Sequence, residues 1–194
     1  MLETTNLRPP AVLKDLEQAS AAVGFTLSSD TLTGALLRTL VASKPIGDIL
    51  ELGTGTGMGT AWLLAGLGRG GRLISVDKSE ETTGIARRFL GSDPRVTFVV
   101  MDGADFIQSC SLQQRTFDLI FADTYPGKFQ LLDETLALLK EGGLYVIDDL
   151  NPQPTWPRGH APHVEHLIST LEQRTDVHIT KLNWSTGLLI AAKY

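Results

Sequence analysis

Residues 49–62, ILELGTGTGMGTAW, contain the change of pattern that decides the fold. Ile49 to Leu52 is a short apolar run broken only by Glu51, which is typical of a buried strand. Glycines follow at positions 53, 55, 57 and 59, and good helix formers come next at 60–67. Because glycine has no Cβ atom, such a turn can be sharp and its backbone N–H groups can contact a ligand. A strand, a glycine-rich turn and a helix in this order predict a nucleotide-type binding unit.

The glycine spacing argues against a dinucleotide site. The dinucleotide fingerprint has a third glycine three positions after the second. That position is Met58 when counted from Gly53 and Gly55, and Thr60 when counted from Gly55 and Gly57. An NAD-type site is therefore disfavoured, while a glycine turn that binds no ligand is the simpler alternative.

The pattern that is present, Glu51-x-Gly53-x-Gly55-x-Gly57, resembles the first motif of the class I S-adenosylmethionine (SAM) methyltransferases. The resemblance implies that the glycines leave room for the methionine and ribose parts of SAM, and that Glu51 faces the amino acid moiety. It predicts a cofactor site containing Glu51, Gly53, Thr54, Gly55, Gly57, Gly59 and Thr60.

Length and composition indicate a single globular domain. The chain has 194 residues, of which 42% are hydrophobic and 20% charged, and its net charge is −5. With no basic cluster, nucleic acid and anionic membranes are not expected partners. Cys110 is the only cysteine, so no intramolecular disulfide is expected. Residues 1–4 do not resemble a secretory signal, and no apolar run reaches the ~20 residues of a membrane helix, so a cytoplasmic protein is expected.

The order of predicted elements gives the fold class. Helices predicted at 11–23 and 31–42 make residues 1–45 an N-terminal part, which we expect to pack on the core or on the partner in a homodimer. Residues 46–194 follow as the SAM-binding part, in which strands alternate with helices and imply an open parallel sheet. The strands are expected at 49–52, 73–76, 96–100, 117–122 and 144–147, followed by a hairpin of 177–182 and 188–192. The intervening helices are expected at 80–90, 104–109, 128–140 and 163–174. This order resembles the α/β, three-layer, Rossmann-like methyltransferase fold, with seven mostly parallel strands and an antiparallel C-terminal strand.

Most predicted strands end in a carboxylate, and ligands of open α/β sheets bind outside those ends. The acids are Glu51, Asp77, Asp102, Asp123 and Asp148. Asp77 comes 24 positions after Gly53, where an acid hydrogen-bonds ribose hydroxyls in nucleotide folds. The alternative is that Asp77 caps the next helix. The family resemblance adds Lys78 to this site, and implies that Asp102, Gly103 and Ala104 lie along the adenine, although Asp-Gly is also a plain turn pair.

Asp123 and the pair Asp148-Asp149 predict the chemistry. If their strands are neighbours, the three carboxylates repel one another unless they share a proton or bind a cation, and hard oxygen ligands suit Mg²⁺ or another divalent ion. The sequence here resembles the cation-dependent O-methyltransferases of the catechol and caffeoyl-CoA type. In those families an Asp-Asn pair follows the fifth strand, and a lysine closely follows the fourth-strand acid. This chain has Asp-Asp, and Pro126 in the place of that lysine.

The nearest lysine is Lys128, beyond a Pro-Gly turn, and it is a candidate base as well as an ordinary surface residue. His160 is a second candidate, because it ends a proline-rich loop, 151–162, that leaves the same edge and holds Trp156. We predict that this loop is a lid over an aromatic or planar acceptor; the alternative is that Trp156 only covers the core.

The sequence therefore predicts a SAM-dependent methyltransferase acting on a hydroxyl of a small, catechol-like acceptor, with Asp123, Lys128 and His160 as catalytic residues. Asp123 is also a predicted cofactor contact, and Asp123, Asp148 and Asp149 are the predicted metal ligands. The alternatives are a SAM-binding protein without catalysis and an NAD-dependent oxidoreductase. The acceptor, the base, the metal requirement and the oligomeric state do not follow from the sequence.

Overall fold

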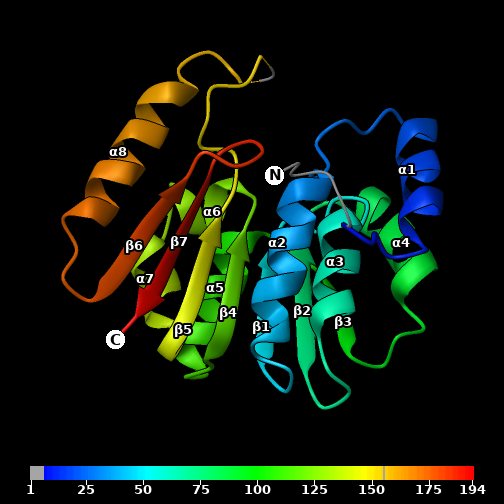
Figure 1. The fold of residues 1–194 in the computed structure, drawn as a ribbon, viewed down its shortest axis with the longest axis horizontal. Coiled ribbons are helices and arrows are strands. Elements are labelled where there is room, and N and C mark those ends of the chain that lie inside the picture. The colour runs from blue at the N-terminus through cyan, green and yellow to red at the C-terminus, as the bar shows by residue number, and fades with distance from the viewer. Residues whose placement is uncertain (1–6, 155) are drawn as a thin grey trace.

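Seven strands form one sheet in the order β3-β2-β1-β4-β5-β7-β6 (Figure 1). The computed structural model describes residues 7–154 and 156–194. Neighbouring strands from β3 to β5 are parallel, whereas β7 is antiparallel to both β5 and β6. The predicted fold, including its antiparallel C-terminal strand, is confirmed. The strands are β1 (Asp48–Leu52), β2 (Arg72–Asp77), β3 (Val96–Val100), β4 (Phe117–Ala122), β5 (Leu139–Ile147), β6 (Val177–Leu182) and β7 (Leu188–Lys193).

Helices cover both faces of the sheet and make three layers (Figure 1). One face packs on α1 (Leu13–Ala22), α2 (Thr31–Ala42), α3 (Met58–Gly66) and α4 (Glu80–Leu90). The other face packs on α5 (Gly103–Leu112), α7 (Leu132–Ala137) and α8 (His160–Glu172), with the short α6 (Tyr125–Lys128) at the end of β4. The two N-terminal helices therefore belong to the same apolar core as α3 and α4 in this chain.

The central strands are apolar on both faces because helices cover both. In β1, Ile49 contributes to the core beneath α1–α4, whereas Leu50 and Leu52 contribute to the core beneath α5, α7 and α8. Glu51 is the exception, a carboxyl group that is fully buried in the middle of the sheet. Because a carboxyl group is costly to bury and adds nothing to the apolar core, its presence here indicates a functional position.

The predicted helix 128–140 is wrong in its extent. The segment divides into α6 and α7, and its last two residues already belong to β5. Leu131 has φ +58°, a left-handed conformation that no α-helix can pass through. A register shift in the pairing of β4 and β5 lets Leu139 pair with Phe117 before the turn at Gly142, so the strand begins earlier than its apolar run indicates.

Two sequence predictions concern the ends of the chain and membranes. Residues 1–4, where a secretory signal is not expected, lie outside the described residues. Within residues 7–154 and 156–194, no helix combines the length and the apolar character needed to span a membrane.

Gly34 allows α2 to lie directly on α3. A Cβ atom at Gly34 would come 2.2 Å from Cδ1 of the buried Trp62. We expect Gly34→Ala to lower the free energy of unfolding by about 1–3 kcal/mol, the usual range for an overpacked core. Chemical denaturation of the purified protein measures this change.

The matched control is Gly84→Ala in α4, where a Cβ atom would meet nothing within 4 Å. Alanine is the better helix former, so this variant should be up to about 1 kcal/mol more stable than wild type. Equal effects of the two substitutions would show that the contact with Trp62 is not the cause.

Candidate active site

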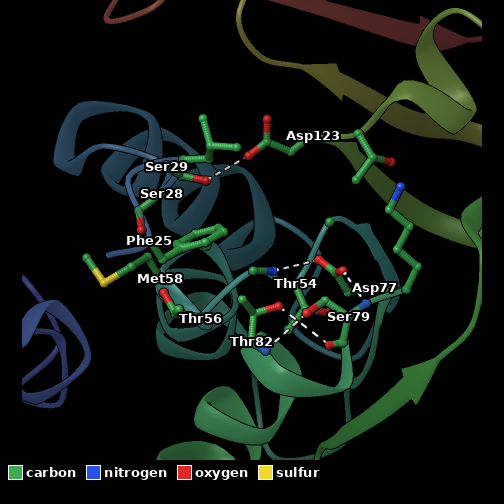
Figure 2. Close-up of a pocket in the computed structure, with 16 residues that line it drawn as sticks. Phe25, Ser28, Ser29, Thr54, Thr56, Met58, Asp77, Ser79, Thr82 and Asp123 are labelled. Atoms are coloured by element: carbon green, nitrogen blue, oxygen red, sulfur yellow. Dashed lines mark hydrogen bonds between the residues drawn. The ribbon is translucent and has the colours of Figure 1, made fainter. Parts of the chain in front are cut away.

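A cavity of about 330 Å³ opens at the carboxyl edge of the sheet, over the glycine turn between β1 and α3 (Figure 2). It extends from the loop between α1 and α2 to the ends of β2 and β4. Its lining consists of Phe25, Leu27, Ser28, Ser29, Gly53, Thr54, Gly55, Thr56, Met58, Gly59, Asp77, Lys78, Ser79, Thr82, Asp123 and Thr124.

The glycine turn is tightly enclosed. Gly53 and Gly55 have φ angles of +110° and +50°, which side chains other than glycine rarely adopt. A Cβ atom at Gly53 would lie 3.0 Å from the carbonyl oxygen of Asp123, and one at Gly55 would lie 2.9 Å from the ring of Phe25. These positions require glycine, and the exposed backbone of the turn forms the floor of the cavity.

Glu51 lies behind this floor, fully buried. Its Oε2 atom accepts hydrogen bonds from the hydroxyls of Thr60 and Ser75, both at 2.5 Å, whereas its Oε1 atom has no partner. Oε1 lies 2.6 Å from where a Cβ atom of Gly59 would be, so it points toward the cavity wall. Burial raises the pKa of Glu51 to about 8, although the two hydroxyls oppose the shift. At neutral pH this carboxyl group therefore carries a proton.

Asp77, at the end of β2, holds the turn from the other side. Its Oδ2 atom accepts a hydrogen bond of 2.9 Å from the backbone N–H of Gly55 (Figure 2). The next helix, α4, is capped by Ser79, whose hydroxyl accepts from the N–H of Thr82. Asp77 is therefore not the helix cap; its Oδ1 atom accepts a hydrogen bond of 2.9 Å from the N–H of Ser79, and the residue lines the cavity.

A smaller cavity of about 250 Å³ continues past Asp77 to Asp102 and Gly103. Asp102 caps α5 by accepting from the N–H of Ala104, at 2.8 Å. Of the residues predicted to contact the cofactor, four lie behind the linings of both cavities: Glu51, Gly57, Thr60 and Ala104. Gly57 packs against Ala86 of α4, while Thr60 holds Glu51.

Asp123 follows β4 and lies between two polar groups. Its Oδ2 atom accepts a hydrogen bond of 3.0 Å from the hydroxyl of Ser29 (Figure 2), and its Oδ1 atom lies 3.5 Å from Nζ of Lys128. Lys128 is only 5% exposed. The alternative that it is an ordinary surface lysine is therefore wrong. Burial raises the pKa of Asp123 to about 7, and Lys128 opposes this shift.

A third cavity, of about 230 Å³, lies on the other side of Ser29 and Asp123, and both residues line it as well as the first cavity. Its remaining lining is mainly polar and includes Thr26, Leu27, Ser28, Asp30, Asp148, Asp149, Gln153 and Thr186. Two ligands bound in the two cavities would therefore meet at Ser29 and Asp123.

The three carboxylates predicted to bind a metal line this third cavity together, but other contacts hold them. Asp148 and Asp149 do follow the end of β5, but the Asp148 carboxylate accepts hydrogen bonds from the hydroxyl of Thr186 and from the N–H of Asp149. Asp123 pairs with Lys128 instead. In the described ranges, no three His, Cys, Asp or Glu side chains are placed to hold a metal ion together. The side chains present thus do not fit a divalent cation.

His160 begins α8 and is half-buried in an aromatic cluster. Its ring centroid lies 5.1 Å from that of Phe129 and 4.8 Å from that of Trp156. Burial and the nearby Lys128 lower the pKa of His160. The residues that line the cavities on either side of Asp123 do not include His160. His160 covers Phe129, the neighbour of Lys128, and Trp156 packs on His160.

Sequence analysis missed the residues of the loop between α1 and α2. Phe25, Ser28 and Ser29 line the main cavity, as does Thr124 after β4. The sequence contains no signal for them, although Asp30, which follows directly, caps α2 by accepting from the N–H groups of Leu32 and Thr33. Their role depends on where the loop folds over the glycine turn.

Comparison with known proteins gives concordant results. A family model described as a methyltransferase domain matches residues 50–150. A protein of Mycobacterium sp. (strain KMS), assigned provisionally as an O-methyltransferase, is 31% identical over 118 residues, covering 59% of this chain and 53% of that protein. The chain thus spans about half the length of the curated relatives it matches.

Two solved structures share the fold, each with a TM-score of 0.84 and 22% identity. One is an O-methyltransferase from Bacillus cereus in complex with S-adenosylhomocysteine (SAH). The alignment covers 98% of this chain and 94% of the Bacillus cereus protein. The other is the O-methyltransferase TomG from Streptomyces achromogenes, involved in tomaymycin synthesis, in complex with SAM. The alignment covers 98% of this chain and 93% of TomG.

The raised pKa of Glu51 predicts how stability depends on pH. In the unfolded chain Glu51 ionises near 4.5, but in the folded chain it keeps its proton up to about pH 8. Between these values the folded state binds the additional proton, so stability contributed by this group is lost as pH rises. The expected loss is up to about 1.4 kcal/mol per pH unit within that window.

Glu51→Gln should flatten this slope, because the amide cannot ionise. Urea denaturation at several pH values between 5 and 8.5 measures the slopes, with the exposed Glu81→Gln as the control that keeps the wild-type slope. Identical slopes for Glu51→Gln and wild type would contradict the assignment of the buried proton to Glu51.

Proposed function

Because this chain belongs to the methyltransferase domain family, we propose that it transfers a methyl group from SAM to a hydroxyl oxygen of a small acceptor. The observation that carries this proposal is that Ser29 and Asp123 line two adjoining cavities. One cavity contains the glycine turn, and the other is lined by polar side chains. The names of the mycobacterial relative and of the two solved structures support oxygen as the methyl acceptor.

The residues of the first cavity fit SAM. A ligand ammonium group, as the methionine part of SAM carries, favours the ionised form of the buried Glu51, whose otherwise unpartnered Oε1 atom can then accept from it. Asp77 lines both the main cavity and the cavity at Gly103, where it can accept from ribose hydroxyls. The glycine turn leaves no room for side chains between these acids. When bound, SAM supplies a sulfonium methyl group that is open to in-line attack by a nucleophile.

The chain's own task is to hold the attacking oxygen and remove its proton. Alignment of the reactants at about 3 Å supplies much of the rate enhancement in such a displacement. Asp123 stands at the boundary of the cavities, and its raised pKa of about 7 suits a group that accepts a proton near neutral pH. The Lys128 ammonium lines neither cavity and acts as a positioning residue through Asp123, whose charged form it stabilises.

His160 has a different role in this proposal. Its place between Phe129 and Trp156 supports a covering function at the start of α8, so Asp123 and Lys128 form the proton-handling pair. The competing function is a SAM-binding protein without catalysis, for which Pro126 in place of the family lysine is the best argument. The buried contact of Lys128 with Asp123 supports the active enzyme over that alternative.

Isothermal titration calorimetry with SAM, SAH and NAD tests the cofactor. We expect binding of SAM and SAH and none of NAD. Release of SAH is then measured with a panel of phenols and catechols as acceptors. Binding of SAM without SAH release from any acceptor would favour the inactive protein, and binding of NAD alone would contradict the proposal.

Asp77→Ala should weaken SAH binding about 10- to 100-fold, because it removes one or two hydrogen bonds to a charged acceptor. Glu81→Ala, which removes an exposed acid from the following helix, is the control and should bind SAH as wild type does. Loss of the hydrogen bond between Asp77 and Gly55 should lower the stability of Asp77→Ala. The melting temperatures of both variants measure this effect. Unchanged SAH affinity in a folded Asp77→Ala protein would remove Asp77 from the cofactor site.

A further inference from the structure

Lys128 directly follows an irregular backbone turn. Pro126 has ψ +139° and Gly127 has φ +90°, so the chain leaves the helical path just before the lysine. A Cβ atom at Gly127 would lie 2.7 Å from the side chain of Leu52 at the end of β1, which places the turn directly on the sheet. The turn is held by the hydrogen bond of 2.8 Å from the N–H of Gly127 to the carbonyl of Gln130, and by the Tyr145 hydroxyl donating to the Gly127 carbonyl.

The ammonium of Lys128 bridges the ends of two neighbouring strands. Its Nζ donates a hydrogen bond of 2.9 Å to the carbonyl oxygen of Asp148 after β5, and lies 3.5 Å from Oδ1 of Asp123 after β4. A buried ammonium is unfavourable unless it has such partners. Clustered carboxylates, for their part, need a positive charge among them. The lysine meets both requirements between the same two strand ends.

The Lys128 ammonium is the positive charge that lies near these carboxylates. The Asp148 side chain turns to Thr186 and to the N–H of Asp149, and offers Lys128 only its backbone carbonyl. Within the described part of the chain, no group of three acidic, histidine or cysteine side chains converges on a metal-sized position. A divalent cation bound between these strand ends would have to displace the ammonium from Asp123.

We propose that the Lys128 ammonium takes the place of a divalent cation between the ends of β4 and β5, so that the acceptor site of this chain works without a bound metal. An ammonium has three donors, one of which goes to the Asp148 carbonyl and one toward Asp123. The lysine lines neither cavity beside Asp123, so it acts on the acceptor through this carboxylate and offers no pair of coordination positions to two vicinal oxygens. A second, vicinal hydroxyl on the acceptor is therefore not required. The statements about the acceptor rest on the proposed function, whereas the statement about the cation does not.

The test measures metal binding directly, with Mn²⁺ as the probe. Full-length protein is treated with EDTA and titrated with MnCl₂, and free Mn²⁺ is followed by electron paramagnetic resonance. Wild type should bind no Mn²⁺ at this site, and its melting temperature should not change with EDTA or Mg²⁺. Lys128→Met keeps most of the side-chain volume but leaves the acids without their cation. It should bind Mn²⁺ at least about tenfold more tightly than wild type.

Two further variants assign the site. Lys14→Ala removes an exposed lysine of α1 and should behave as wild type, which excludes an effect of net charge alone. Adding Asp123→Asn to Lys128→Met should abolish the gained Mn²⁺ binding. The proposal is overturned if wild type binds one Mn²⁺ that Asp123→Asn removes, or if folded Lys128→Met gains none.

SAH calorimetry on the same preparations separates the two proposals. Failure to bind SAH counts against the proposed function and leaves the result for Mn²⁺ standing. Where turnover is measured, wild type should be insensitive to EDTA and should methylate a phenol as readily as the corresponding catechol. A loss of turnover in EDTA that Mg²⁺ restores would overturn the inference.

Discussion

A parallel sheet brings the carboxyl ends of its strands to one edge, and in this chain those ends carry acids that cannot all be ionised side by side. The structure satisfies each acid in a different way. Glu51 keeps its proton, because burial raises its pKa to about 8. Asp77 accepts from the backbone of the glycine turn, and Asp102 caps a helix. Asp123 pairs with Lys128, and Asp148 accepts from Thr186. The electrostatics of the site follow from this constraint.

The same edge receives the loop between α1 and α2. Phe25 packs on Gly55, and Ser29 donates to Asp123, so this one loop contacts both the glycine turn and the end of β4 (Figure 2). Ser29 and Asp123 consequently separate the two cavities without closing either. Leu27 and Ser28 also line both cavities, and a boundary of this kind is well suited to a reaction in which a small group passes between two ligands. This arrangement connects the fold to the proposed methyl transfer.

Lys128 shows how a shift along the sequence changes the chemistry of a site. It lies two residues after the position that a lysine occupies in the cation-dependent families the sequence resembles. The irregular backbone at Pro126 and Gly127 carries it back to Asp123. There its charge lies where oxygen ligands alone would otherwise need a metal ion. An ammonium carries a charge of +1 and donates hydrogen bonds in fixed directions, whereas a +2 ion offers several coordination positions. The two therefore differ in how many acceptor oxygens they can hold.

The sequence by itself determined the features that depend on local pattern. The glycine turn after an apolar run, the alternation of strands and helices, and the acids at Glu51, Asp77 and Asp123 were all readable from it, because backbone geometry and burial periodicity are local properties. They predicted the fold and seven of the sixteen residues that line the main cavity. The extent of the helix after Lys128 was not readable, since the left-handed conformation at Leu131 overrides good helix propensity.

Only the tertiary structure decided which of these residues meet. The burial of Lys128, the contact of Ser29 with Asp123, and the proton held by Glu51 depend on which elements become neighbours. The orientation of the Asp148 carboxylate toward Thr186, 38 residues away, likewise depends on a contact between distant segments. Side-chain direction and burial arise from packing over long sequence distances, and no pattern within a single segment contains them.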